Sequence, residues 1–314
     1  MLGWTAMGVL VFVIFWPAMW VDPLGTLGHV VSQARIYAIE GHENGTFFNG
    51  QVLAPGDYTW YFYPVSYLWR ATPVTLVGAL LALAGLLFPR RLGVTAVQRR
   101  TILILFLFAA LFTVFMSLGA KQFDRYLLPV HVILDLAAGL GWVVTILALF
   151  NRYATRWREV TRRWASIGAL ALVVFAQMGG ALQTFPYYFN YYNPLLGGDT
   201  AALNVMMVGW GDGLDQAAAY LNSLPDAKDL EVISWYGDGP FSYLFDGKTI
   251  SLDVTDQLDF LQKADYVVLY LNQWQRELPS KEVLEYFWQR TPVFTARIGD
   301  IEYARVYQMG DSNP

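Results

Sequence analysis

Long runs of apolar residues are the feature that most restricts what this chain can fold into. A helix needs about 20 largely apolar residues to cross the roughly 30 Å hydrocarbon core of a bilayer. Five runs approach that length, and they predict an α-helical transmembrane bundle of about five helices. The runs are Leu2 to Trp20, Val74 to Phe88, Thr101 to Leu118, Val130 to Phe150 and Ala165 to Gln183.

The composition agrees with a membrane protein and divides the chain in two. Hydrophobic residues make up 55% of the 314 residues and charged residues only 15%, whereas soluble domains carry about 25% charged residues. Lys and Arg outnumber Asp and Glu by 13 to 7 up to residue 198, and are outnumbered by 18 to 8 beyond it. We therefore expect a transmembrane region over 1–184, with an outer loop at 21–73, and a small extracytoplasmic α/β domain over 185–314.

Arginines in two connections predict the topology. One group lies between the second and third apolar runs and the other between the fourth and fifth. Loops rich in Lys and Arg stay in the cytoplasm. We therefore expect the N-terminus on the cytoplasmic side of a plasma membrane and the C-terminal domain on the outer side. The first run opens at once, without a basic leader or cleavage site, so we interpret it as a retained span. Such an abrupt start also fits a chain whose upstream portion is missing.

The first outer loop combines a predicted helix with many aromatic residues. Apolar residues recur at helical spacing from Leu24 to Ala38, which predicts an amphipathic helix in the membrane interface that ends before Gly41. Most of the aromatic residues between Tyr58 and Tyr67 are interpreted as a belt at headgroup level, and the rest as the lining of a groove for a sugar or an isoprenoid. His42 is expected to contact a ligand or fix the loop. Its spacing matches no strong metal motif, although a metal is not excluded.

A short charged segment, Lys121 to Pro129, lies between two apolar runs. If Lys121 and Arg125 lie on helical turns, they are four residues apart and share a face. Two such cations suit a lipid phosphate, because Arg offers a planar fork to its oxygens and Lys adds a point charge. The alternative is that Lys121 pairs with Asp124, while Arg125 and Tyr126 only anchor the helix at the headgroups.

His131 and Asp135 fall inside the fourth apolar run, four residues apart. A carboxylate deep in a bilayer costs roughly 2.5–3.5 kcal/mol on insertion scales, so an ionisable residue there is a functional candidate. The alternative that we favour is a structural pair between the two side chains near the outer surface.

The C-terminal part alternates predicted strands and helices, which predicts a mostly parallel sheet with a final antiparallel hairpin at Gly299-Asp300. The absence of cysteine excludes disulfides, and no histidine follows His131, which excludes a serine-histidine hydrolase in this domain. No basic patch supports nucleic-acid binding. The expected strands are Leu230 to Trp235, Thr249 to Leu252, Tyr266 to Leu271, Val293 to Ile298 and Ile301 to Tyr307; the expected helices are Leu214 to Leu224, Phe241 to Phe245, Asp256 to Gln262 and Lys281 to Gln289.

Four segments together resemble one enzyme family. They are Gly41 to Gly50, Lys121 to Pro129, Tyr187 to Gly198 and Gly209 to Leu214. In their order and topological side they resemble the C-terminal half of GT-C membrane glycosyltransferases. The closest group is the phospholipid-carrier-dependent enzymes related to protein O-mannosyltransferases and lipid A aminoarabinose transferases.

The resemblance implies a reaction in which a sugar moves from a polyprenyl phosphate to an acceptor hydroxyl on the outer side of the membrane. Cations placed where charge develops on the leaving phosphate lower the barrier. Lys121 and Arg125 match the basic positions of the family, with Tyr126 as a hydrogen-bond donor and His42 as a further substrate contact. No cofactor is implied, and the acceptor, whether glycan, lipid or protein, is not specified.

The general base is where the chain departs from the family. The family carries a catalytic carboxylate in its first outer loop, before spans that this sequence lacks, so the catalytic residue is unknown and the chain is expected to be inactive alone. None of the acidic residues in the loop here matches that motif; these are Asp22, Glu40, Glu43 and Asp57.

Two other functions stay open. The chain is alternatively a non-catalytic membrane protein that binds or moves a lipid-linked saccharide through the same cations. It is otherwise a membrane anchor whose C-terminal domain binds a partner.

Overall fold

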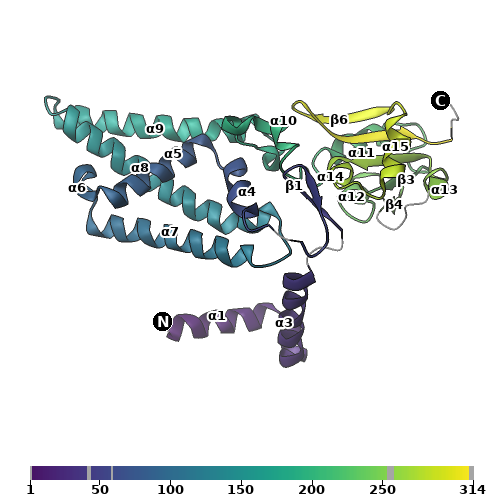
Figure 1. Cartoon of the computed structure of the whole chain (residues 1–314), viewed down its shortest axis with the longest axis horizontal. Helices are drawn as coiled ribbons and strands as arrows, with labels where there is room; N and C mark the ends of the chain where they lie inside the picture. Colours follow the sequence, from purple (N-terminus) through teal and green to yellow (C-terminus); the bar gives the residue numbers. More distant parts are fainter. Residues whose placement is uncertain (1, 41–43, 58, 253–257, 311–314) are drawn as a thin grey trace.

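The computed structural model describes residues 2–40, 44–57, 59–252 and 258–310, and it comprises a helical region followed by an α/β region (Figure 1). The first helices stand apart from the main bundle in Figure 1, except where the end of the third meets the segment before residue 121. The helices of this region are α1 (Leu2–Phe15), α2 (Ala18–Val21), α3 (Pro23–Glu40), α4 (Phe62–Arg70), α5 (Pro73–Leu87), α6 (Pro89–Leu92), α7 (Ala96–Ser117), α8 (Leu128–Tyr153) and α9 (Glu159–Gln183).

Three helices in the described part of the chain are long and apolar enough to cross a membrane. They are Ala96–Ser117, the continuous segment Asp124–Tyr153, and Glu159–Gln183. At most 28% of the apolar window in each is buried inside the protein. Apolar surface that is left so open is stable in hydrocarbon rather than in water, so the chain is associated with a membrane.

The other two predicted spans differ from expectation. The first run breaks at Pro17, which has no N–H to donate within a helix, and α1 is only 14 residues long, or about 21 Å at 1.5 Å per residue. The second run forms α5, which has 15 residues and reaches spanning length only together with α4. That pair is bent by 116° at the break before Pro73.

Small residues hold α5 and α8 together. A Cβ added to Gly141 would lie 2.1 Å from the carbonyl oxygen of Gly78, and Ala82 is fully buried beside it. Close backbone contact through glycine and alanine is the usual way in which helices pack in a membrane. The bundle is therefore built around one tight helix pair.

The α/β region contains a five-stranded sheet in the order β4-β3-β5-β7-β6. Pairing is parallel between β3 and both of its neighbours and antiparallel on both sides of β7. Strands β3 to β6 therefore share one direction and β7 opposes them, which confirms the mostly parallel sheet and its final hairpin. The strands are β3 (Glu231–Ser234), β4 (Lys248–Ser251), β5 (Tyr266–Tyr270), β6 (Phe294–Ile298) and β7 (Ile301–Gln308); the helices are α10 (Gly198–Ala202), α11 (Leu214–Asn222), α12 (Pro240–Leu244), α13 (Leu258–Leu261), α14 (Leu271–Gln275) and α15 (Lys281–Trp288).

Alternate residues of the central strands enter two separate cores. Val267 and Leu269 pack with α15 on one face of the sheet. Val268 and Tyr270 pack with α11 on the opposite face. The α11 core also includes Tyr63 and other residues at the end of the membrane helices. Because one core crosses from the helices to the sheet, the α/β region rests on the end of the bundle, and the boundary at 184/185 stays a prediction.

The loop at 21–73 contains the predicted helix and an unpredicted hairpin. The predicted helix is confirmed as α3, whereas its amphipathic character and its place in the interface stay predictions; β1 (Thr46–Phe48) pairs with β2 (Gln51–Leu53) across a turn at Asn49-Gly50. Both turn residues have positive φ, as a tight hairpin turn requires. Gly41, His42, Glu43 and Tyr58 lie outside the described residues.

The belt interpretation is wrong for part of the aromatic run. Trp60 is 74% exposed, as a belt residue would be, but Phe62 and Tyr63 are 4% and 0% exposed. Both lie in the core that joins the helices to the sheet. They face inward because α4 packs against α7 and the turn before α8.

Candidate functional site

The segment around Lys121 is extended first and helical only afterwards. Lys121 to Phe123 precede a single 3₁₀ turn, η1 (Asp124–Leu127), which leads into α8. Lys121 is thus outside the helix, and the expectation that it shares a helical face with Arg125 is wrong. The Lys121 ammonium lies 3.5 Å from the centroid of the Tyr37 ring on α3, where a cation–π contact stabilises it.

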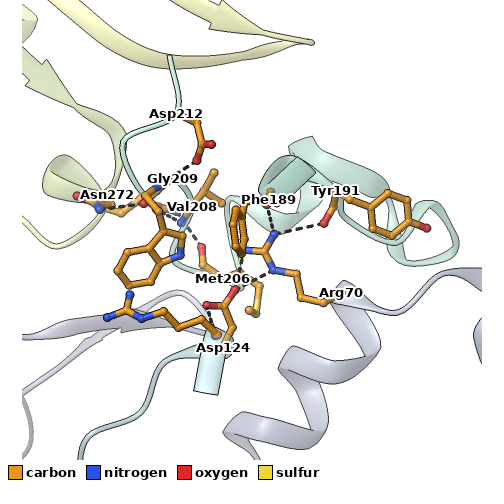
Figure 2. Close-up of polar contacts among 12 residues, drawn as sticks. Arg70, Asp124, Phe189, Tyr191, Met206, Val208, Gly209, Asp212 and Asn272 are labelled. Atoms are coloured by element: carbon orange, nitrogen blue, oxygen red, sulfur yellow. Dashed lines mark hydrogen bonds and ion pairs between the residues drawn. The ribbon is translucent and has the colours of Figure 1, made fainter. Parts of the chain in front are cut away.

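Asp124 pairs with Arg70 rather than with Lys121, so the alternative pairing is also wrong. The Arg70 guanidinium donates from Nε to Asp124 Oδ2 at 2.8 Å, and its Nη2 lies 2.6 Å from the same oxygen (Figure 2). Its Nη1 donates to the carbonyl oxygens of Phe189 and Tyr191. The Arg70 and Asp124 side chains are 12% and 9% exposed. Further hydrogen bonds stabilise a buried pair, and the two carbonyls accept such bonds from Nη1 of Arg70.

Arg125 has a different environment. Its guanidinium lies 4.0 Å from the Trp210 ring centroid and 4.3 Å from that of Phe123. Among the described residues it has neither an ion pair nor a hydrogen bond. Aromatic faces hold a guanidinium in place without neutralising it. The guanidinium N–H donors of Arg125 are therefore not used by any described residue and can bind a ligand.

A cavity of about 190 Å³ lies where these groups meet. Its walls are formed by the η1 turn, the start of α8 and the aromatic exit from α9. It contains one carboxylate, that of Asp124, and this group is already held by Arg70. The cavity is lined by Arg70, Asp124, Arg125, Leu128, His131, Tyr188, Phe189 and Tyr191.

His131 faces this cavity and does not pair with Asp135. Its ring lies 4.9 Å from that of Tyr67. Asp135 Oδ1 instead accepts a hydrogen bond of 2.7 Å from the Thr75 hydroxyl, and no ion pair joins the two described side chains. The predicted His131–Asp135 pair is wrong because α5 supplies a closer hydroxyl for the carboxylate.

A second cavity, of about 380 Å³, contains Lys121 and Tyr126. Its walls come from α3, the end of α7 and the η1 turn, and they are mostly apolar; they include Ala34, Phe115, Met116 and Leu118. The adjacent residues Arg125 and Tyr126 thus line different cavities. The structure brings Lys121 and Tyr126 to one cavity, and the Tyr126 ring also lies 5.4 Å from the Arg125 guanidinium that lines the other.

A glycine-rich loop places Trp210 against Arg125. Gly209, Gly211 and Gly213 all have positive φ, which glycine adopts without steric cost. The Tyr270 hydroxyl accepts from Gly211 N at 2.9 Å and donates to Asp212 O at 3.0 Å. Burial raises the pKa of Tyr270 well above its ordinary value, so the hydroxyl keeps the proton that it donates.

The sheet region fixes the same loop at two more points. Asn272 Nδ2 donates to the Gly209 carbonyl at 2.9 Å, and Val208 N donates to Gln275 Oε1 at 2.8 Å (Figure 2). The indole Nε1 of Trp210 is buried without a hydrogen-bond partner among the described residues. The α/β region therefore positions the indole ring that stacks on Arg125.

Sequence reasoning missed Arg70 and Trp210. Arg70 is the only Lys or Arg between residues 36 and 89, and it ends an aromatic run. A single cation at the end of an aromatic run could have indicated a buried ion pair or a site residue. Trp210 lies in the segment Gly209 to Leu214, which carried the family resemblance but was not assigned to the site. His42, the fourth predicted contact, lies outside the described residues.

The described residues contain no group of three or more His, Asp or Glu side chains that could hold a metal ion. The fold and the site thus define a membrane-associated helical protein with a cationic, aromatic cavity at the end of the helices on which the C-terminal α/β region rests. No protein-family model, no curated protein and no solved structure matches the chain.

Proposed function

We propose that this chain is part of an integral membrane glycosyltransferase, which moves a sugar from a polyprenyl-phosphate carrier to an acceptor hydroxyl on the outer side of the membrane. The proposal combines the residues of the site with the resemblance to GT-C enzymes. Its sugar and its acceptor are not specified.

One observation carries the proposal, namely that Arg125 is held between two aromatic rings with no counter-ion among the described residues. Arg70 and Asp124 neutralise each other, so the cavity keeps the positive charge of Arg125. A phosphate oxygen matches the donors of this guanidinium. Arg125 is thus proposed to stabilise the negative charge that develops on the carrier phosphate as the sugar leaves.

The neighbouring cavity suits the other part of such a ligand. Its mostly apolar walls and the Lys121 ammonium fit an isoprenoid chain that enters from the bilayer and a charge near its phosphate. Tyr126 lines this cavity and is proposed as a donor there. The isoprenoid chain would then lie on one side of the η1 turn, in the cavity of Lys121, and the phosphate would reach Arg125 on the other side.

The proposed orientation follows the arginines. Basic connections lie between α5 and α7 and between α8 and α9, at the end of the bundle far from the α/β region (Figure 1). Cytoplasmic placement of these connections puts the site and the α/β region on the outer side of a plasma membrane.

The test uses the full chain in detergent and a short-chain polyprenyl phosphate, with bound lipid counted by native mass spectrometry. We expect Arg125→Gln to weaken binding about tenfold or more, because a charge-assisted hydrogen bond contributes roughly 1.5–3 kcal/mol. The matched control is Arg35→Gln, which removes the same charge from an exposed position on α3. Equal affinity of the Arg125 variant and the control would contradict the proposal.

A non-catalytic role is the second candidate, because Asp124 is the only carboxylate that lines the Arg125 cavity and it is held by Arg70. A glycosyl transfer needs a general base, which the proposed enzyme must take from outside this cavity. Carrier binding that depends on Arg125, without sugar transfer from a labelled polyprenyl-phosphate sugar to any tested acceptor, would favour a protein that binds or moves a lipid-linked saccharide.

A further inference from the structure

A separate cavity of about 500 Å³ lies at the arginine-rich end of the bundle. It is an open cavity between α6, the first turn of α7 and the last turns of α8, and α6 lies far from the α/β region (Figure 1). The α8 residues that line this cavity, Val144 to Arg152, lie about 24 to 36 Å from the start of the helix at 1.5 Å per residue, so the cavity is well separated from Arg125. Its polar lining residues are Arg90, Arg91, Gln98, Asn151 and Arg152.

The charge of this cavity is positive and uncompensated. Three guanidinium groups line it and no carboxylate does. Within the described ranges, the side chains of Arg90, Arg91 and Arg152 form no ion pair or hydrogen bond. The Arg91 and Arg152 guanidinium groups instead lie near the rings of Phe88 and Tyr153, each at 5.7 Å from the ring centroid. Three cations on one cavity repel each other unless an anion joins them.

Neutral donors add to the positive charge. Gln98 occupies the third position of α7, where its Oε1 accepts from the Thr95 backbone N at 2.9 Å and its side-chain NH₂ makes no hydrogen bond to a described residue. The start of a helix of 22 residues carries partial positive charge and attracts anions. The Asn151 amide is also unengaged among the described residues.

The remaining wall is apolar and belongs to a membrane helix. Val144, Leu147 and Ala148 of α8 line the cavity on that side. Arginines in a cytoplasmic loop set the orientation of a membrane protein whichever way their side chains point. Topology therefore explains their presence, but it does not explain why three of them converge on one cavity beside a helix start.

We propose that this cavity binds one phosphate-type anion, supplied either by the headgroup of an anionic lipid or by a soluble phosphomonoester. The planar fork of each guanidinium matches phosphate oxygens, and basic pockets between membrane helices bind lipid headgroups in this way. The site is distinct from the Arg125 cavity and does not depend on the function proposed for it.

The experiment compares two triple variants of the full chain in nanodiscs of phosphatidylcholine with phosphatidylglycerol. R90Q/R91Q/R152Q removes the cavity cations. R99Q/R100Q/R158Q removes the same charge from arginines in the same two connections that do not line the cavity. Phosphatidylglycerol retained after transfer to detergent is counted by native mass spectrometry. The single variant R91Q is included in case the triple variant does not fold.

We expect the wild type and the R99Q/R100Q/R158Q control to retain one phosphatidylglycerol. The cavity variant should bind about tenfold or more weakly and R91Q at an intermediate level, since each charged hydrogen bond contributes roughly 1.5–3 kcal/mol. Glycerol 3-phosphate then identifies the source. If glycerol 3-phosphate does not displace the phosphatidylglycerol, the site binds a lipid headgroup. If it displaces the lipid from the wild type and this effect requires the cavity arginines, the site binds a soluble phosphomonoester. Equal retention by both triple variants, or equal loss, would overturn the proposal.

Discussion

Two arginines of one cavity differ in what they are available to do. Arg70 is held by the Asp124 carboxylate and two carbonyl oxygens, whereas Arg125 is held only by aromatic faces. Both arginines line the same cavity, yet only Arg125 has side-chain donors left for a ligand. The first is therefore a positioning residue, which fixes the η1 turn to the exit from α9.

Breaking the Arg70–Asp124 pair should destabilise the protein strongly. We expect Arg70→Gln to lower the free energy of unfolding by about 3–5 kcal/mol, because a buried carboxylate is then left without its counter-ion. Thermal unfolding of the full chain in detergent measures this as a lower Tm. The double variant Arg70→Met/Asp124→Leu should recover much of the loss, since neither charge is then buried alone.

The matched control is a surface pair of the same kind. Lys248 and Glu231 are paired on neighbouring strands, with the lysine side chain 68% exposed. Lys248→Gln should change the stability by less than about 1 kcal/mol. A similar Tm for Arg70→Gln and Lys248→Gln would show that the buried pair is not structural.

At the scale of elements, the close contact between α5 and α8 holds the bundle together. Gly78 and Gly141 meet backbone to backbone, and this contact sets where Asp135 and Thr75 lie relative to each other. The apolar runs predicted both helices. They did not predict which faces meet, because leucine and glycine are equally compatible with a span.

Gly141→Ala should therefore destabilise the protein, although alanine is the better helix former. The added Cβ would lie 2.1 Å from the Gly78 oxygen, and overpacking of this kind costs about 1–3 kcal/mol. Gly139→Ala is the matched control on the same helix, because nothing lies within 4 Å of its Cβ position. That control should be neutral or more stable by up to about 1 kcal/mol. Equal Tm values for the two variants would contradict the close contact.

At the scale of the whole molecule, the α/β region and the arginine-rich connections occupy opposite ends of the bundle (Figure 1). One hydrophobic core joins the sheet to the membrane helices. The site at this junction needs both parts, because Arg125 comes from the helical region and Trp210 from the loop that the sheet fixes.

The proposed topology is testable with single cysteines, because the natural chain has none. Tyr243 is 91% exposed in the α/β region, and Val97 is 75% exposed at the arginine-rich end. In intact cells we expect a membrane-impermeant maleimide to label Tyr243→Cys at once and Val97→Cys only after permeabilisation. Labelling in the reverse order would place the α/β region in the cytoplasm.

The sequence by itself determined the local elements. Apolar runs located the long helices α7, α8 and α9, and short strand-like segments located all five strands of the sheet. It also indicated the Lys121–Arg125 segment as a site, because two cations between apolar runs need partners. These features depend on neighbours in the chain, and periodicity reports such neighbours directly.

Only the tertiary structure decided which groups meet. Lys121 contacts Tyr37 and Arg70 pairs with Asp124, across separations of 84 and 54 residues that no local pattern encodes. The predicted pairs failed because they assumed a helix through residue 121 and the nearest opposite charge as partner. A buried ion takes the partner that also completes its hydrogen bonds, and that choice is made by packing between elements far apart in the chain.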